Sequence, residues 1–241
     1  MGRLAIVGGH SILAPDLAGV VFPQGARRRP AHGARGAVTA LDTGDYLVLS
    51  RHGLDRYTPA HLVDHARNLL ALQAAGCDRI LALSSVGSLR IERGVGTFLV
   101  PDDFMALDRP ATSVHDDARC HVVPGFTEAW RARVLEAWSR TTAEPLVDGG
   151  VYWQSNGPRF ETPAEIRFIA QHADVVGMTA ASECIVANEL GLDYATLCVV
   201  DNVANGLGAE NLTREEFEAG KVANQQRVIA ALEAIVSELA R

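Results

Sequence analysis

Short apolar runs alternate with amphipathic stretches along this chain, and that alternation limits the available folds more than any other feature. The apolar runs that read as buried strands are residues 3–7, 79–83 and 194–200. Between and after them, stretches such as 59–76 carry apolar residues at helical spacing. Alternating strands and helices predict an α/β fold with a mixed central sheet. With 241 residues, 48% of them hydrophobic, we expect a single domain over residues 1–241.

Charge and cysteine content argue against several classes of protein. A net charge of −7 disfavours nucleic acid or an anionic membrane as a partner, and the basic cluster at 27–29 is expected in a solvated loop. No signal peptide or membrane-spanning run is evident, so a cytoplasmic location is expected. The 4 cysteines show no metal-ligand spacing, so we expect reduced thiols and no bound metal.

The stretch from Asn156 to Glu165, which reads NGPRFETPAE, is the most distinctive local motif. Its Gly-Pro pair is a turn signal, and its Thr and last Glu have the spacing of a capping box with Pro at the first helical position. Phe160 and Glu161 are therefore expected on a short loop that opens a helix, where an acid can face a cleft. Taken alone, the pattern also fits a surface turn with a solvated Glu161.

Several strand ends carry residues suited to an anion. Glycines in the stretch 8–11 would let backbone N–H groups approach an anion closely. A hairpin expected over 37–50 ends in Arg51-His52, and a guanidinium can bind phosphate through two N–H groups. Small residues at Ser84-Ser85 leave room for a ligand. Each pattern taken alone also fits an ordinary turn or a surface side chain.

The order of these motifs resembles the purine nucleoside phosphorylases, in the trimeric branch that includes methylthioadenosine and methylthioinosine phosphorylases. The motifs that carry the resemblance are GPRFET at 157–162, VGMT at 176–179 and a strand ending in Asp201-Asn202. The resemblance extends over nearly the whole chain. It implies a twisted sheet flanked by helices, a homotrimer, a purine nucleoside and inorganic phosphate as substrates, and no cofactor.

The resemblance also implies a phosphate site near the first strand. Its expected residues are His10, Ser11, Arg51, His52, Ser85 and Thr179. His10 stands where the family usually has Ser or Thr, and an imidazole can also donate a hydrogen bond to phosphate.

A nucleoside site is implied in the same way. Its expected residues are Ser84, Phe160, Glu161, Met178, Glu183, Asn202 and His121. The resemblance assigns Glu183 to the ribose hydroxyls, although Ser182 replaces the family's usual Pro before it. His121 or Phe126, in the irregular stretch 106–127, is expected to reach a neighbouring subunit's pocket. The residues expected to be catalytic are Arg51, Glu161 and Asn202.

Base preference depends on Glu161 and Asn202. An ionised Glu161 can only accept, which suits the N1–H of a 6-oxopurine, and Asn202 can donate toward O6 or hold N7. In adenosine-cleaving relatives these positions typically carry a small hydroxyl residue and Asp, so inosine, guanosine or 5′-methylthioinosine is the expected substrate. A one-residue shift at the strand end would turn Asp201 into the pocket instead, because strand neighbours face opposite sides.

Alternative functions stay open. These are phosphorolysis of 5′-methylthioadenosine, hydrolysis of the same bond by water, and nucleoside binding without catalysis. Phosphate dependence separates phosphorolysis from hydrolysis, and binding without turnover would indicate a binding protein. A Rossmann dehydrogenase is not expected, since the glycine fingerprint is missing.

Overall fold

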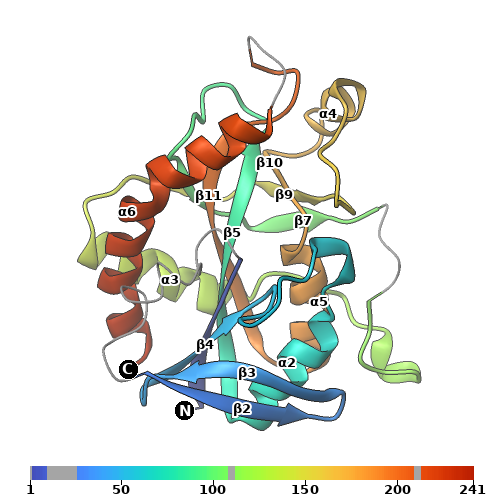
Figure 1. The fold of residues 1–241 in the computed structure, drawn as a ribbon, viewed down its shortest axis with the longest axis vertical. Coiled ribbons are helices and arrows are strands. Elements are labelled where there is room, and N and C mark those ends of the chain that lie inside the picture. Colours follow the sequence, from blue (N-terminus) through green and yellow to red (C-terminus); the bar gives the residue numbers. More distant parts are fainter. Residues whose placement is uncertain (1, 10–25, 108–111, 209–212) are drawn as a thin grey trace.

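A computed structural model describes residues 2–9, 26–107, 112–208 and 213–241. Within these residues one mixed sheet of 11 strands runs through the molecule, which confirms the predicted α/β class (Figure 1). The strands are β1 (Arg3–Gly8), β2 (Arg27–Gly33), β3 (Gly36–Asp42), β4 (Tyr46–Ser50), β5 (Cys77–Ser88), β6 (Phe98–Val100), β7 (Asp103–Met105), β8 (Leu146–Asp148), β9 (Val151–Gln154), β10 (Val175–Gly177) and β11 (Asp193–Val203).

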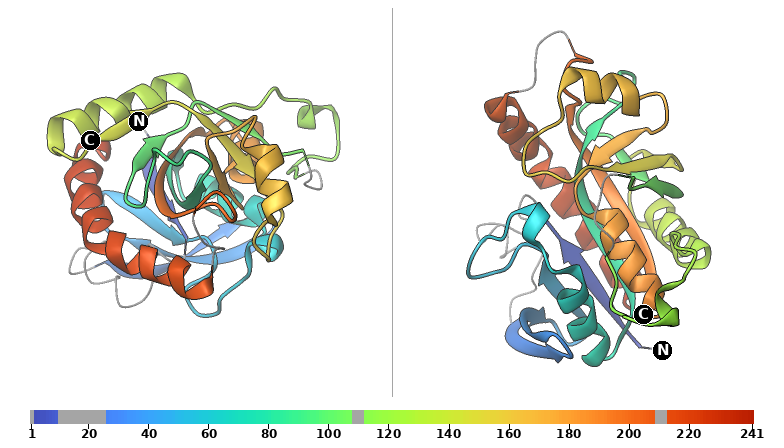
Figure 2. Two further views of the ribbon diagram at one scale, coloured as in Figure 1. Left: turned by 90° about the horizontal axis from the view of Figure 1, so that it is seen from above. Right: turned by 90° about the vertical axis from the view of Figure 1, so that its right-hand side faces the viewer.

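Helices cover both faces of this sheet. They are α2 (His65–Ala74), α3 (Glu128–Thr141), α4 (Pro163–Ile169), α5 (Ala180–Glu189) and α6 (Arg214–Leu239), with short 3₁₀ turns at Ala60–Leu62 and Ala118–Cys120. Helices α3 and α6 lie on one side of the central strands and α2 and α5 on the other, as the two rotated views also show (Figure 2). No helix among the described residues is long and apolar enough to cross a membrane.

The core follows the period of two that a strand imposes on its side chains. In β1, Leu4 and Ile6 pack with α3 and α6, whereas Ala5 and Val7 pack with α2 and α5. All four side chains are almost completely buried. A strand buried on both faces reads as a continuous apolar run, which explains why the run at 3–7 predicted it correctly.

Three local predictions need correction, and the first concerns the basic cluster. The stretch 27–29 is part of the edge strand β2, which pairs antiparallel with β3, although its arginine side chains are exposed as expected. Arg28 and Arg29 form ion pairs with Asp55 and Asp42, so strand pairing and local charge partners outweigh the polar composition. The expected hairpin at 37–50 is present as β3 and β4.

The helix expected over 59–76 is shorter than predicted. Its N-cap is Asp64, whose side chain accepts a hydrogen bond from Arg67 N at 2.8 Å, so α2 starts at His65. Strand β5 in turn continues to Ser88, which places Ser84 and Ser85 inside the strand rather than in a loop after it.

Candidate active site

A cavity of about 500 Å³ opens at the carboxyl ends of the parallel strands β4, β1, β5 and β11. It brings together many of the residues predicted from sequence. These are Arg51, His52, Ser84, Ser85, Phe160, Glu161, Met178, Thr179 and Asn202. Ligands of open α/β sheets bind at this edge, so the location fits a substrate site.

The register of the sheet explains why residues distant in sequence meet here. Gly8 in β1 pairs with Ser50 in β4 and with Leu83 in β5. Gly9 follows β1 and Arg51 follows β4, so both residues reach the same cavity. His10 and Ser11, also predicted to bind phosphate, lie outside the described residues.

Arg51 is held by a buried ion pair behind the cavity wall. Its Nε lies 2.5 Å from Glu183 Oε1 and its Nη2 lies 2.9 Å from Glu183 Oε2. Nη1 also donates to Leu83 O at 3.1 Å, and Nη2 to Val7 O at 3.3 Å. A guanidinium has five N–H groups, so one N–H on Nη1 is left for a ligand. This corrects the expectation that Arg51 binds phosphate through two N–H groups.

Glu183 faces Arg51 and does not line the cavity. Its side chain is fully buried, and Oε2 also accepts a hydrogen bond from the Tyr194 hydroxyl at 3.0 Å. Burial raises the pKa of Glu183, but the charge and hydrogen bonds of Arg51, together with the neighbouring His65, outweigh burial and lower that pKa. This geometry gives no support to the predicted contact between Glu183 and ribose, since the carboxylate is shielded and already paired.

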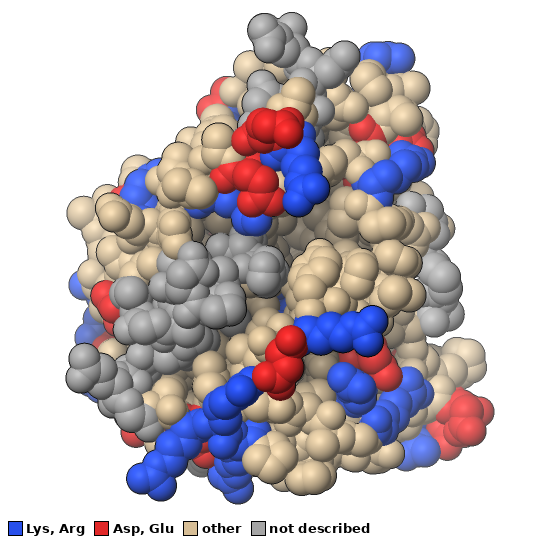
Figure 3. Space-filling model, viewed as in Figure 1, with Lys and Arg blue, Asp and Glu red and all other residues tan. Residues whose placement is uncertain are grey.

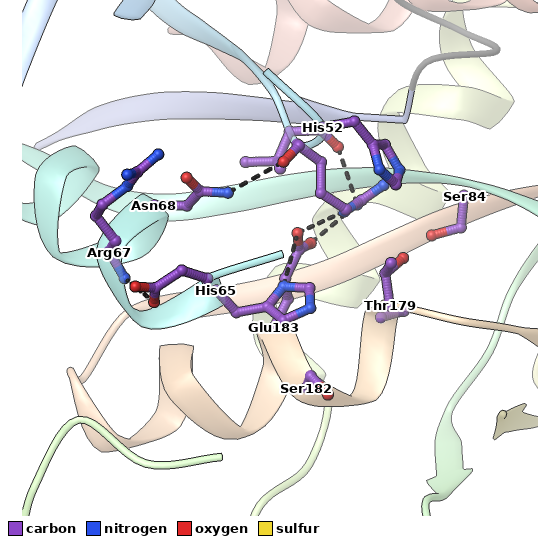
Figure 4. Close-up of polar contacts among 12 residues, drawn as sticks. His52, His65, Arg67, Asn68, Ser84, Thr179, Ser182 and Glu183 are labelled. Atoms are coloured by element: carbon purple, nitrogen blue, oxygen red, sulfur yellow. Dashed lines mark hydrogen bonds and ion pairs between the residues drawn. The ribbon is translucent and has the colours of Figure 1, made fainter. Parts of the chain in front are cut away.

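His65, which the sequence did not indicate, completes this buried cluster. Its Nδ1 lies 3.5 Å from Glu183 Oε1, too far for a good hydrogen bond, and the ring is turned toward the carboxylate (Figure 4). Neither ring nitrogen has a hydrogen-bond partner among the described residues. The sequence signal that could have pointed to His65 is its place directly after Asp64, the N-cap of α2.

His52 lies at the same end of the cavity as Arg51. Its Nδ1 contacts Thr58 O at 2.7 Å, and because a carbonyl only accepts, Nδ1 carries the hydrogen. The ring stacks on Tyr57, which also lines the cavity, with a centroid distance of 5.3 Å. These contacts fix the orientation of the imidazole plane.

Glu161 lies on the loop between β9 and α4, as predicted. The capping box between Thr162 and Glu165 is present and starts α4, while Asn205 Nδ2 donates to Glu161 O at 2.9 Å. Burial raises the pKa of Glu161, and a hydrogen bond with Ser155 opposes this shift. The carboxyl group is thus held at the cavity by a rigid loop and partly removed from water.

Asn202 lines the cavity, whereas Asp201 lies behind it. In the pairing of β11 with β5, Val200 is opposite Val86 and Asn202 is opposite Gly87, so Asp201 is the extra residue of a bulge. A Cβ at Gly87 would lie 3.2 Å from Asn202 Nδ2, so glycine lets this amide approach the strand closely. Of these two neighbours, Asn202 is therefore the one that faces the cavity.

The first turns of α6 form a cavity wall that the sequence analysis missed. Four side chains contribute to it, namely Arg214, Phe217, Glu218 and Lys221. Phe217 meets Phe160 edge-on at 5.2 Å between ring centroids, and Lys221 pairs with Glu218 at 2.8 Å. Apolar spacing along a helix shows which side faces the core, but not which cavity its first turns reach.

Two residues expected at a neighbour's pocket differ in their surroundings. Phe126 is buried in the core of its own chain and stacks with Tyr194 at 6.1 Å between ring centroids, so it cannot also extend outward. His121 is exposed and lies outside the cavity lining. Of the two, only His121 is free to meet another subunit.

The described part of the chain contains no cluster of side chains suited to a metal ion. No group of three or more His, Cys, Asp or Glu residues there could hold a metal ion, and all four cysteines are free.

Charged side chains of both signs are interspersed on the face drawn in Figure 3. The described residues thus supply hydrogen bonds, charge and apolar surface to a ligand.

Comparisons with known proteins agree with this arrangement. The family profile described as the Phosphorylase superfamily matches residues 3–237. A protein of Archaeoglobus fulgidus, named a probable 6-oxopurine nucleoside phosphorylase, is 36% identical over 84% of this chain and 83% of its own. One of Pseudomonas syringae pv. tomato, named a probable S-methyl-5′-thioinosine phosphorylase, is 34% identical over 97% and 98%.

A solved structure shares the fold. Methylthioadenosine phosphorylase from Schistosoma mansoni, in complex with adenine, superposes with a TM-score of 0.82 at 24% identity. The match covers 100% of this chain and 93% of that one.

Proposed function

We propose that this chain, which belongs to the phosphorylase superfamily, uses inorganic phosphate to cleave the N-glycosidic bond of a 6-oxopurine nucleoside. The products are the free base and ribose 1-phosphate, or the 5-methylthio analogue if the substrate is 5′-methylthioinosine. The observation that carries the proposal is the placement of Glu161 and Asn202 on the cavity that Arg51 and Thr179 also line. The names of the sequence relatives support a 6-oxopurine substrate.

The chemistry follows from where charge develops. As the bond breaks, positive charge builds on ribose and negative charge on the base, so the enzyme must hold an anionic nucleophile and stabilise the leaving purine. The remaining N–H of Arg51, together with Gly9 and Thr179, would hold phosphate. Met178 offers polarizable apolar surface to the sugar, and Asn202 donates to the base as its charge grows.

A substrate panel with and without phosphate tests this function. Inosine, guanosine, adenosine and the two 5′-methylthio nucleosides should be incubated with the enzyme, and free base measured over time. Phosphate-dependent release of hypoxanthine or guanine is expected. Equal release without phosphate would identify a hydrolase, and tight nucleoside binding without release would identify a binding protein.

Phosphate affinity should depend on Arg51. In Arg51→Lys the positive charge next to Glu183 remains, but the N–H directed at phosphate is lost, so the KM for phosphate should rise about tenfold or more. Steady-state kinetics at saturating inosine measures this. Arg29→Lys, at an exposed ion pair, is the matched control and should match wild type. An unchanged KM in Arg51→Lys would place the anion elsewhere.

Lowering the pH should weaken 6-oxopurine cleavage, and the loss should begin at a higher pH than the usual pKa of a glutamate would give. The raised pKa of Glu161 means that its carboxylate gains a proton earlier as pH falls, and a protonated Glu161 no longer accepts from N1–H with both oxygens. A pH profile of kcat/KM for inosine should show this acidic limb, and Glu161→Gln should lack it. An identical limb in the variant would assign the titration to another group.

We further propose a cytoplasmic homotrimer. Free cysteines fit a reducing compartment. In the same stretch as His121, 106–127, Leu107 and Val123 expose 72% and 98% of their surfaces, as expected for apolar residues that a neighbour would cover. Light scattering should give about three times the mass of the chain, and Val123→Asp should reduce it. A stable, fully active monomer would contradict the assembly.

A further inference from the structure

Ser85 and Asp201 contact each other at the edge of the cavity, from the neighbouring strands β5 and β11. The Ser85 hydroxyl donates a hydrogen bond to Asp201 Oδ2, and Asn224 Nδ2 of α6 donates to Asp201 Oδ1 at 2.8 Å. Asp201 and Asn224 are buried, whereas Ser85 is half-buried and lines the cavity. Asp201 therefore adjoins the ligand space through Ser85.

The direction of these hydrogen bonds follows from the groups involved. An ionised carboxylate only accepts, and a serine hydroxyl has one hydrogen and two lone pairs. Asn224 Nδ2 also donates to Val200 O at 2.8 Å, which fixes the orientation of its amide because a carbonyl cannot donate. The only hydrogen of Ser85 thus points toward Asp201. Toward the cavity Ser85 presents lone pairs.

Lone pairs on Ser85 do not suit phosphate, the ligand group that the family resemblance assigned to this residue. Phosphate oxygens carry negative charge and require donors, so an acceptor is a poor partner for them. A ribose hydroxyl can donate and would match. Ser85 is therefore chemically better suited to the sugar than to phosphate.

The position of Ser85 along β5 agrees with this match. On one side, Leu83 O accepts from Arg51, which marks the phosphate end of the cavity. On the other, Gly87 adjoins the Asn202 amide, which marks the base end. Because phosphate attacks the sugar from the side opposite the base, the ribose must lie between these ends, next to Ser85.

We propose that Asp201 is a positioning residue that holds the Ser85 hydroxyl as an acceptor for a ribose hydroxyl. The bulge in β11 makes this possible, since it lets Asp201 face Ser85 while the next residue, Asn202, faces the cavity. The inference rests on the proposed nucleoside substrate and replaces the assignment of Ser85 to the phosphate site.

Enzyme variants combined with sugar analogues test the proposal. Wild type and Ser85→Ala are compared on inosine, 2′-deoxyinosine and 3′-deoxyinosine at about pH 8, where carboxylates are ionised. The ratio of the two kcat/KM values on each substrate cancels the intrinsic reactivity of that substrate. We expect Ser85→Ala to lose about three- to tenfold on inosine, the effect of one hydrogen bond, with an unchanged KM for phosphate. The loss should vanish on the deoxynucleoside that lacks the hydroxyl contacted by Ser85.

Asp201→Asn tests the role of Asp201 itself. The new side chain can still accept from Asn224 through Oδ1, but its Nδ2 donates to Ser85 and turns the serine hydrogen toward the cavity. Fluorine at the sugar position identified with Ser85→Ala cannot donate, so wild type should prefer the hydroxyl over the fluoro analogue. Asp201→Asn should reduce this preference about threefold or more. Thermal unfolding of both variants establishes that they are folded.

Three results would overturn the proposal. One is a raised KM for phosphate in Ser85→Ala with nucleoside parameters unchanged, which would show that the hydroxyl donates to phosphate. Another is an equal loss on all three sugars, and the third is an unchanged fluoro preference in Asp201→Asn. If wild type cleaves no nucleoside, the proposed function fails; calorimetric binding of inosine and its deoxy analogues to wild type and Ser85→Ala then decides the inference separately.

Discussion

Inosine is expected to be cleaved about 10⁴ times more efficiently than adenosine, measured as the ratio of kcat/KM values. The ionised Glu161 carboxylate accepts from the N1–H of a 6-oxopurine, whereas adenine N1 offers a lone pair against it. Because Glu161 is partly buried, water cannot readily relieve that repulsion, and the mismatch costs more than it would at the surface. The same ratio is expected between 5′-methylthioinosine and 5′-methylthioadenosine.

Two substitutions should narrow this preference. In Glu161→Gln the amide can donate to adenine N1, and in Asn202→Asp the new carboxylate can accept from the adenine amino group. Each should reduce the inosine-to-adenosine ratio by about tenfold or more. Glu165→Gln is the matched control, because Gln also supports the capping box that starts α4. Adenosine turning over faster than inosine in wild type would refute the assignment of Glu161 and Asn202.

Removing Glu183 should destabilise the protein by about 3–5 kcal/mol, because Arg51 would be left as an unpaired charge in the core. Both side chains are almost fully inaccessible to water, at 2% and 0% exposure, so solvent cannot replace the lost carboxylate. Glu183→Ala should therefore lower the melting temperature by roughly 6–20 °C for a chain of this size. Urea unfolding followed by circular dichroism measures the free energy of unfolding directly.

A double variant separates the charge effect from general loss of packing. Arg51→Met combined with Glu183→Leu removes both charges while keeping side-chain volume, and its stability should be close to that of wild type or higher. Activity should be lost in the double variant, since Arg51 lines the cavity. If Glu183→Ala unfolds like wild type but shows a higher KM for the nucleoside, Glu183 contacts ribose and the buried pair is not its main role.

Local sequence patterns predicted much of the fold because the physics that sets them acts within a few residues. The runs at 3–7 and 194–200 are strands β1 and β11. The capping box at Thr162 placed Glu161 on its loop, because caps satisfy backbone groups of the adjacent turn. The edge strand β2 was missed because its pairing with β3, rather than its own composition, makes it a strand.

The sequence by itself determined the α/β class. It also determined which residues lie at the strand ends that border the cavity. Only the tertiary structure decided what those residues do there. Arg51 and Glu183 are 132 positions apart, and their pairing together with the Leu83 and Val7 carbonyls leaves Arg51 a single N–H for a ligand. Likewise, the bulge that sends Asp201 behind the cavity depends on its register with β5. Hydrogen bonds between distant segments settle which donors remain free, and no local pattern of residues encodes that.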